Sequence, residues 1–225
     1  MPWGDGIVDG KDVEALMKYW GQEFINPDPL IPRDFLAHWA LDEVEGMFAE
    51  ESVSGEMDVV LGNPTWQPEG GQVGGCLEFD GVDDMIILKP VLNPADDPFS
   101  LFAWVKGGGP GQVILSQQTG VNWLKVDTDG TLMTELSKSG GRIPGSPLYS
   151  ETVITDGNWH RIGFVWDGAQ RFLYVDDIPV AIDDQASLGG STGGLVIGVG
   201  TDNQAGTFWS GMIDDVRIYS RAITP

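Results

Sequence analysis

From residue 35 onward, the sequence consists of short runs of β-forming residues separated by glycine and other turn-forming residues. In one run Ile162, Phe164 and Trp166 alternate with other residues, as expected for a strand with one buried face. The dipeptide Asp167–Gly168 then leads into another apolar run, which is a strong hairpin signal. Four runs are particularly clear: 99–105, 112–115, 159–166 and 171–175. Many short strands with no helical pattern between them predict an all-β, antiparallel sandwich of the jelly-roll type.

The first 34 residues differ from the rest of the chain. Val13, Leu16, Met17 and Trp20 have the spacing of one apolar face of a helix, and Asp12 precedes them as a candidate N-cap. Residues 25–34 contain three spaced prolines, which favour a stiff linker. We therefore expect three regions: a loop and helix over 1–24, a linker over 25–34, and one large domain over 35–225, the whole being a piece of a longer protein.

The charge of the chain excludes some classes of partner. Lys and Arg number 12 against 34 Asp and Glu, which gives a net charge of −22. Affinity for nucleic acid and for anionic membrane surfaces comes largely from Lys and Arg, so we expect neither partner. No apolar run approaches the roughly 20 residues that span a bilayer. The single cysteine, Cys76, rules out an internal disulfide and is interpreted as a small buried apolar residue.

Five motifs occur in one order over about 190 residues, starting with 37–43 (Ala-His-Trp-Ala-Leu-Asp-Glu) and 74–81 (Gly-Gly-Cys-Leu-Glu-Phe-Asp-Gly). The remaining three are the strand 99–106, the hairpin 158–176 and the closing segment 211–222. Together they resemble the laminin G-like domains of the concanavalin A-like lectin/glucanase superfamily. Two positions depart from the family pattern: Asp177 stands where the hairpin usually has Gly, and Glu51 where an Asp usually precedes Ser-x-Ser-Gly.

The first 24 residues resemble one repeat of a dockerin, an EF-hand-like calcium loop followed by a helix. The resemblance places Asp5, Asp9 and Asp12 at loop positions 5, 9 and 12, with Gly6 at the sharp turn. Met1 and Trp3, however, occupy positions that normally carry oxygen ligands. The alternatives for this segment are a calcium loop that docks to a protein partner and a helical stub without metal.

The laminin G-like resemblance also implies a structural Ca²⁺ on the main domain. In that family the Asp of the F-D-G turn and the first Asp of the last strand often hold the ion, which nominates Asp80 and Asp214, with Asp83 as a further candidate. Crowded carboxylates repel one another unless a cation neutralises them. The alternative is that Asp80 accepts hydrogen bonds from turn amides and the other carboxylates are solvated.

Two further patterns bear on function. Glu78, Asp80 and Asp83 imitate the Glu-x-Asp-x-x-Glu strand of some glucanases on this fold, but Gly81 would break the strand and Asp83 is shorter than Glu. Trp66 and Trp123 lie in candidate loops and would be sugar-stacking platforms if exposed, or core residues if buried. The histidines, His38 and His160, both fit strand motifs and are interpreted as structural.

These observations predict a non-catalytic, extracellular or cell-surface module that binds carbohydrate or another surface ligand and carries a structural calcium. A structural or protein-docking module that binds no sugar is the alternative from another functional class. A glycoside hydrolase is the third hypothesis. Fold alone does not decide among them, because this superfamily hosts lectins, adhesion modules, enzymes and spacers.

Overall fold

The computed structural model describes residues 35–138 and 145–225, so the expected loop, helix and linker, with Asp5, Asp9 and Asp12, lie outside the described residues. Within the described ranges every regular element is a β-strand, and no helix could cross a lipid bilayer. The strands are β1 (Phe35–Trp39), β2 (Phe48–Glu51), β3 (Glu56–Leu61), β4 (Thr65–Gln67), β5 (Cys76–Asp80), β6 (Met85–Ile87), β7 (Phe99–Gly107), β8 (Val113–Gln117), β9 (Asn122–Val126), β10 (Thr131–Thr134), β11 (Leu148–Val153), β12 (Trp159–Trp166), β13 (Gln170–Val175), β14 (Ile178–Asp184), β15 (Leu195–Ile197) and β16 (Ser210–Tyr219).

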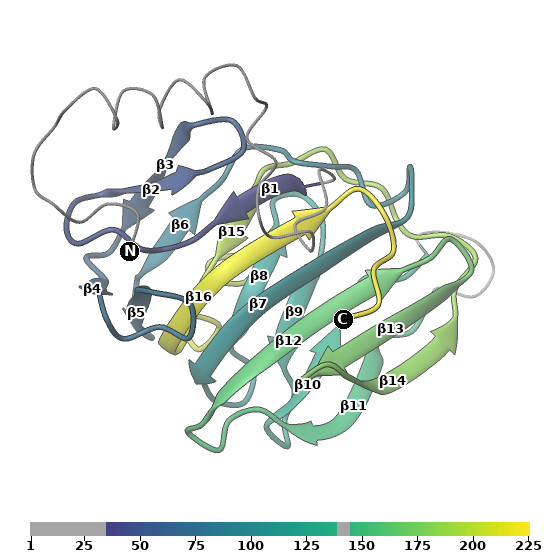
Figure 1. Cartoon of the computed structure of the whole chain (residues 1–225). Helices are drawn as coiled ribbons and strands as arrows, with labels where there is room; N and C mark the ends of the chain where they lie inside the picture. Colours follow the sequence, from purple (N-terminus) through teal and green to yellow (C-terminus); the bar gives the residue numbers. More distant parts are fainter. Residues whose placement is uncertain (1–34, 139–144) are drawn as a thin grey trace, which may run out of the picture. The chain divides into compact units, whose positions relative to one another are not determined.

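The strands form an antiparallel sandwich whose layers are continuous with each other. The hydrogen-bonded order is β11-β10-β9-β8-β15-β6-β3-β2-β1-β16-β7-β12-β13-β14, and β5 joins β4 to β16. Figure 1 shows β16, β7, β12, β13 and β14 as one layer, with β8 to β11 behind it. The two ends of the order contact each other, since β11 packs near β14. This arrangement confirms the expected all-β antiparallel sandwich.

The strongest local predictions are confirmed in register. β12 pairs with β13 across the predicted Asp167–Gly168 turn, with Trp166 opposite Arg171. The side chains of Ile162, Phe164 and Trp166 all point into the core, where each is at most 5% exposed. The first and last strands run together, as the family resemblance implies, because β1 pairs with β16.

A β-bulge interrupts β16 at the two consecutive aspartates. Asp214 lies opposite Trp104 of β7, and Arg217 lies opposite Phe102, so β16 has one extra residue between them. Asp215 adopts a positive φ of 52°, a conformation that Asp tolerates better than most residues. In a regular strand consecutive side chains point to opposite faces, but a bulge re-aims them. Both carboxylates are consequently buried.

Candidate functional site

An acidic turn joins β5 to β6. One carboxylate oxygen from each of Asp80, Asp83 and Asp84 lies within 4.8 Å of the others, so the three could hold a metal ion. Asp80 Oδ1 also accepts a hydrogen bond from the Val82 amide at 2.7 Å, and Asp84 Oδ2 accepts one from the Asp80 amide at 2.8 Å. The expected turn-amide role of Asp80 is therefore present, and it coexists with the acidic group.

Asp84 is the buried member of this turn. Its exposed fraction is 2%, and burial raises its pKa, helped by the neighbouring charges of Asp80 and Asp83. Gly62, with a φ of +96°, approaches so closely that an added Cβ would lie 2.3 Å from Asp84 Oδ1. Asp84 was not among the ligands predicted from the sequence, although its adjacency to Asp83 was a visible signal.

Asp214 does not join the acidic turn. Asp80 pairs with Ser210, so Asp214 lies four residues further along β16, roughly 13 Å away at the usual rise per residue. Asp214 Oδ2 instead accepts hydrogen bonds from the amides of Gln72 and Val73 at 2.6 and 2.9 Å. The expected ligand set of Asp80, Asp83 and Asp214 is thus divided between two places.

The environment of Asp214 is unusual for a carboxylate. Its side chain is fully buried, and among the described residues its Oδ1 has no hydrogen-bond partner. Burial raises the pKa of Asp214 to about 6, the two amides oppose this, and the charges of Asp215 and Asp42 raise it further. An unpartnered buried carboxylate oxygen is costly, so it marks a place where a cation would be favourable.

Asp42 and residues 70–75, a loop with four glycines that we call the glycine loop, complete the surroundings of Asp214. Asp42 Oδ1 accepts a hydrogen bond from the Gly75 amide at 2.5 Å. A Cβ on Gly74 would lie 2.4 Å from Asp42 Oδ1, and one on Gly71 would lie 2.7 Å from Asp214 Oδ2. The loop backbone therefore closes on both carboxylates, and only glycine permits this approach. Asp42 follows β1 within the motif 37–43, which indicated the fold in the sequence but did not identify Asp42 as a ligand.

The glucanase-like spacing does not form a catalytic strand. β5 ends at Asp80, Gly81 has a φ of +83°, and Asp83 lies in the turn that follows. Glu78 accepts a hydrogen bond from Gln67 Nε2 at 2.8 Å. The third carboxylate is therefore not on the strand, so the three side chains do not alternate along it.

The two candidate tryptophans are in the core and not on exposed loops. Trp123 is 0% exposed and packs beside Phe99. Trp66 is 9% exposed, and its Nε1 donates to the carbonyl of Gly46 at 2.9 Å. Neither ring is placed as an open stacking platform. Cys76 is fully buried, and burial raises the pKa of its thiol to about 11, in keeping with its interpretation as a small apolar residue.

A Ser–His–Asp hydrogen-bond chain occurs where β1, β2 and β16 meet. Ser52 Oγ lies 3.0 Å from His38 Nδ1, and His38 Nε2 lies 2.8 Å from Asp215 Oδ1. The amides that could form an oxyanion hole are already used, because those of Val53 and Ser54 donate to the carboxylate of Glu51. A negative carboxylate at that place would repel a developing oxyanion. The chain of hydrogen bonds connects β1, the turn after β2 and β16.

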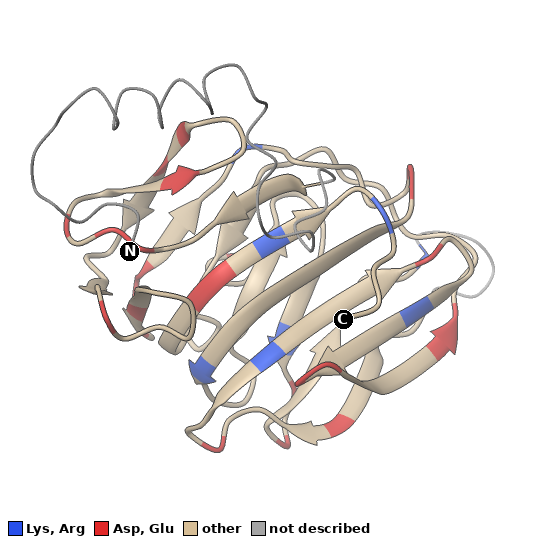
Figure 2. Ribbon diagram, in the orientation of Figure 1, with Lys and Arg blue, Asp and Glu red and all other residues tan. Residues whose placement is uncertain are grey.

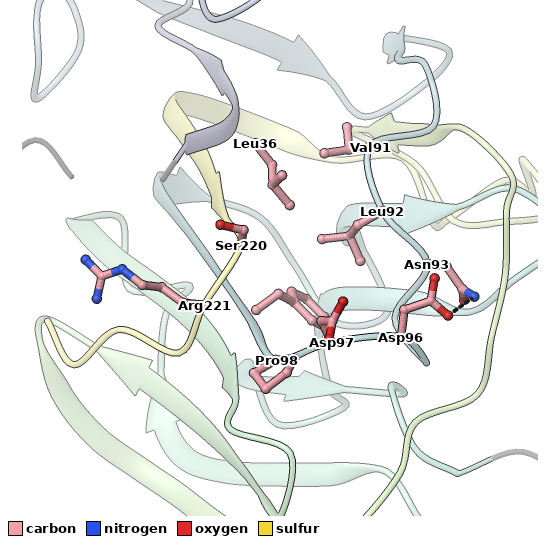
Figure 3. Close-up of a pocket in the computed structure, with 10 residues that line it drawn as sticks. Leu36, Val91, Leu92, Asn93, Asp96, Asp97, Pro98, Ser220 and Arg221 are labelled. Carbon is pink, nitrogen blue, oxygen red and sulfur yellow. Dashed lines mark hydrogen bonds between the residues drawn. The ribbon is translucent and has the colours of Figure 1, made fainter. Parts of the chain in front are cut away.

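A ligand-sized hollow of about 420 Å³ lies beside the connection between β6 and β7. Leu36 of β1 faces Val91 and Leu92 of the connection and forms an apolar wall (Figure 3). Asp97 points into the hollow, while Asp96 is hydrogen-bonded to Asn93 Nδ2 at 2.8 Å. An apolar wall with a few polar side chains is the usual composition of a small-ligand pocket, and the volume is within the usual range.

This hollow was not predicted from the sequence. Its polar side chains come from the run Asn93-Pro-Ala-Asp-Asp-Pro98, which reads only as a turn. The apolar wall arises because β1 and the β6–β7 connection, which are far apart in the chain, lie side by side in the fold. Exposed polar residues on a loop between strands were the available signal.

The chain is similar to known proteins at the level of the family and of the fold. The model of the concanavalin A-like lectin/glucanases superfamily matches residues 80–225. A comparison with curated proteins finds no match.

Several solved structures share the fold. The binding domain of Paraclostridial mosquitocidal protein 1 is 13% identical with a TM-score of 0.68, covering 84% of this chain and 49% of that one. Domain 4 of AbnA, an extracellular arabinanase from Geobacillus stearothermophilus in complex with arabinotriose, is 18% identical with a TM-score of 0.58, covering 85% and 95%. A Trypanosoma rangeli sialidase is 18% identical with a TM-score of 0.55, covering 83% and 30%. The chain thus spans about half of the first structure and under a third of the sialidase.

Proposed function

The chain belongs to the concanavalin A-like lectin/glucanases superfamily, and from this premise we propose that it is a non-catalytic, extracellular module that binds carbohydrate. The observation that carries the proposal is the hollow beside the β6–β7 connection. Its apolar wall suits the C–H face of a saccharide, and Asp97, Asn93 and Asp96 offer hydrogen-bond partners for hydroxyl groups. The arabinotriose complex of the similar arabinanase domain supports the same ligand class.

The non-catalytic part of the proposal rests on what hydrolysis would need. A glycosidase places two carboxyl groups on either side of the scissile bond. The carboxylates of the acidic turn do not lie along one strand, and Asp96 and Asp97 come from consecutive positions on one side of the hollow. The Ser52–His38–Asp215 network has a carboxylate where an oxyanion hole would be required.

The test is a glycan array probed with the full 225-residue chain, followed by titration of any glycan that binds. We expect Asp97→Asn to weaken binding about tenfold, because a charged hydrogen bond is lost, and Leu36→Asp to abolish it. Asp202→Asn, which changes an exposed carboxylate on a distant loop, is the matched control. If glycan binding survives both hollow variants, the site is elsewhere. If no glycan binds, the proposed function is wrong.

We further propose that the module holds a structural calcium ion at Asp214 and Asp42. The unpartnered, buried Oδ1 of Asp214 and the glycine loop that closes on both carboxylates support this place. Ca²⁺ prefers several oxygen ligands, and loop carbonyls commonly supply those that carboxylates do not. The acidic turn of Asp80, Asp83 and Asp84 is the second candidate, supported by its close carboxylates.

A further inference from the structure

The solvent face of β2, β3 and β6 is apolar where a sheet of this kind is usually polar. Five large side chains lie on it and are between 38% and 50% exposed: Phe48, Met57, Val59, Leu61 and Ile87. We call these five residues the β2–β3–β6 patch.

The strand register places the members of the patch side by side. Phe48 and Ile87 both lie opposite Val59, one on each side, so the three form a row across the strands. Met57 and Leu61 are two positions from Val59 and therefore share its face. The intervening residues Asp58 and Val60 point inward and are buried. Contiguous exposed apolar surface of this kind marks interaction sites on folded proteins.

A hollow of about 330 Å³ lies next to β3, where the inward-facing Val60 and none of the patch residues line it. Val44 and Met47, which are 69% and 63% exposed, lie at its rim, and Val60 and Trp66 line it. The Met47 carbonyl accepts a hydrogen bond from the Val60 amide at 3.0 Å, which holds the rim against β3. The hollow gives an apolar side chain of a partner a place to insert beside β3.

The surroundings of the patch are acidic. Residues 34–88 contain 13 Asp and Glu and not one Lys or Arg. Figure 2 shows acidic segments along this part of the ribbon. Glu50 lies opposite Met57 and therefore points to the same face, and Glu45 lines the hollow. Lys89, just beyond β6, is already paired with Glu56 at 2.5 Å.

We propose that the β2–β3–β6 patch and the hollow next to β3 form a docking surface for a protein segment whose apolar side chains are flanked by Lys or Arg. The apolar residues would cover the patch, and the cations would meet Glu45 and Glu50. A second copy of this chain is disfavoured, since it would bring together surfaces of the same sign on molecules of net charge −22. An anionic membrane is disfavoured for the same reason, and a saccharide would find few hydrogen-bond partners on aliphatic side chains.

Addition of a strand beside β2 is not the mode of docking, because β2 already lies between β3 and β1 and pairs with β1 where Glu51 lies opposite Trp39. Glu43 Oε1 also accepts a hydrogen bond from the Glu50 amide at 2.7 Å, so this amide is not available to an added strand. The exposed face therefore carries the interaction, and its specificity comes from side chains.

The test uses the full chain and a synthetic amphipathic peptide of Leu and Lys, with a peptide of the same pattern in Leu and Glu. Titration calorimetry measures the affinity, and amide chemical-shift mapping identifies the residues at the binding surface. We expect the Leu/Lys peptide to shift amides of β2, β3 and β6, and the Leu/Glu peptide not to bind. Phe48→Thr combined with Val59→Thr should weaken binding at least tenfold, or about 1.4 kcal/mol.

Two controls distinguish specific binding at the patch from non-specific binding to exposed side chains. Ile178→Thr combined with Ile182→Thr removes two apolar side chains of β14 that are more exposed than Phe48 and Val59, and it should leave affinity unchanged. Glu45→Gln combined with Glu50→Gln should weaken binding several-fold at about 0.05 M salt, and the difference should shrink at about 0.5 M because salt screens exposed charges.

Several outcomes would overturn the proposal. The patch variant could bind the Leu/Lys peptide as tightly as the wild type, or the Leu/Glu peptide could bind as tightly as the Leu/Lys peptide. The chemical-shift changes could be confined to β14. The free chain could also form a dimer that the patch variant does not form. Binding to anionic vesicles in preference to the peptide would also overturn the proposal. Because the patch is separate from the hollow beside the β6–β7 connection, glycan binding should be the same in the patch variant and the wild type.

Discussion

His38 and Asp215, which are 177 residues apart in the chain, lie 2.8 Å apart where β1 meets β16. The same Asp215 oxygen also accepts a hydrogen bond from Arg217 Nε at 2.8 Å. Burial opposes the charged form of Asp215, but the hydrogen bond from His38 and the charge of Arg217 lower its pKa overall. The hydrogen bond between the charged carboxylate of Asp215 and His38 therefore connects the last strand, β16, to the first strand, β1.

Replacing Asp215 by Asn should lower the free energy of unfolding by about 1 to 3 kcal/mol. Asn tolerates the positive φ of 52° at the bulge, so the change removes the charge and leaves the backbone preference largely intact. Urea unfolding at neutral pH measures the loss, and Asp202→Asn is the control for an exposed carboxylate. Equal midpoints for Asp215→Asn and the wild type would show that this charge does not stabilise the junction.

Calcium should raise the melting temperature of the wild type relative to chelator. Binding to the folded state alone stabilises it by about 2 to 3 kcal/mol at roughly a hundred times Kd. Scanning calorimetry with Asp214→Asn and Asp83→Asn distinguishes the two candidate places. We expect the calcium effect to disappear in Asp214→Asn and to persist in Asp83→Asn. The reverse pattern would place the ion at the acidic turn. An unchanged melting temperature of the wild type would show that the protein does not bind a stabilising calcium ion.

The metal-free protein should show a second effect at Asp214. A carboxyl whose folded-state pKa is raised to about 6 contributes stability below its ordinary value of 3.8, and this contribution is lost as pH rises through 6. In chelator at neutral pH, Asp214→Asn removes a buried charge and should be more stable than the wild type by up to about 2 kcal/mol. A variant that is less stable under these conditions would argue against an unfavourable charge at Asp214.

His160 should make stability depend on pH near neutrality. Burial opposes its charge, but hydrogen bonds from its ring to Asp176 and Asp156, at 2.9 and 3.1 Å, raise its pKa above 6.5. A raised histidine pKa contributes stability that is fully present below 6.5 and is lost as pH rises through the folded value. The difference in urea midpoint between wild type and His160→Gln should therefore be larger at about pH 5.5 than at about pH 8.5. A difference that is the same at both values would contradict this role.

Gly163 should not tolerate alanine. It lies in β12 opposite Phe102, and an added Cβ would be 2.4 Å from two atoms of the Phe102 ring. Phe102 belongs to a small cluster on the outer side of the sheet with Val165, Tyr174 and Tyr219. Gly163→Ala should displace this ring and lower the free energy of unfolding by about 1 to 3 kcal/mol. Gly109→Ala, where the nearest atoms are 3.8 Å away, is the control and should be nearly neutral.

Much of the fold could be predicted because its signals are local. The alternation of Ile162, Phe164 and Trp166 and the Asp167–Gly168 turn predicted β12, β13 and their pairing, and the structure confirms them. The five family motifs predicted the adjacency of the first and last strands, which is also confirmed. Trp66 and Trp123 were harder to interpret, because their neighbours in sequence resemble loops while their rings are buried by distant strands.

The sequence by itself determined the strands, the turns and the strongly acidic character of the chain, because period-two alternation, turn residues and charge are properties of neighbouring residues. Only the tertiary structure decided which carboxylates share a place. Strand register sets Asp214 apart from Asp80, and the glycine loop brings Asp42 into its surroundings. Strand register also places the members of the β2–β3–β6 patch next to one another. The fold brings β1 beside the β6–β7 connection, and this forms the hollow of about 420 Å³. These sites depend on long-range pairing, and that pairing is the information that a local pattern does not contain.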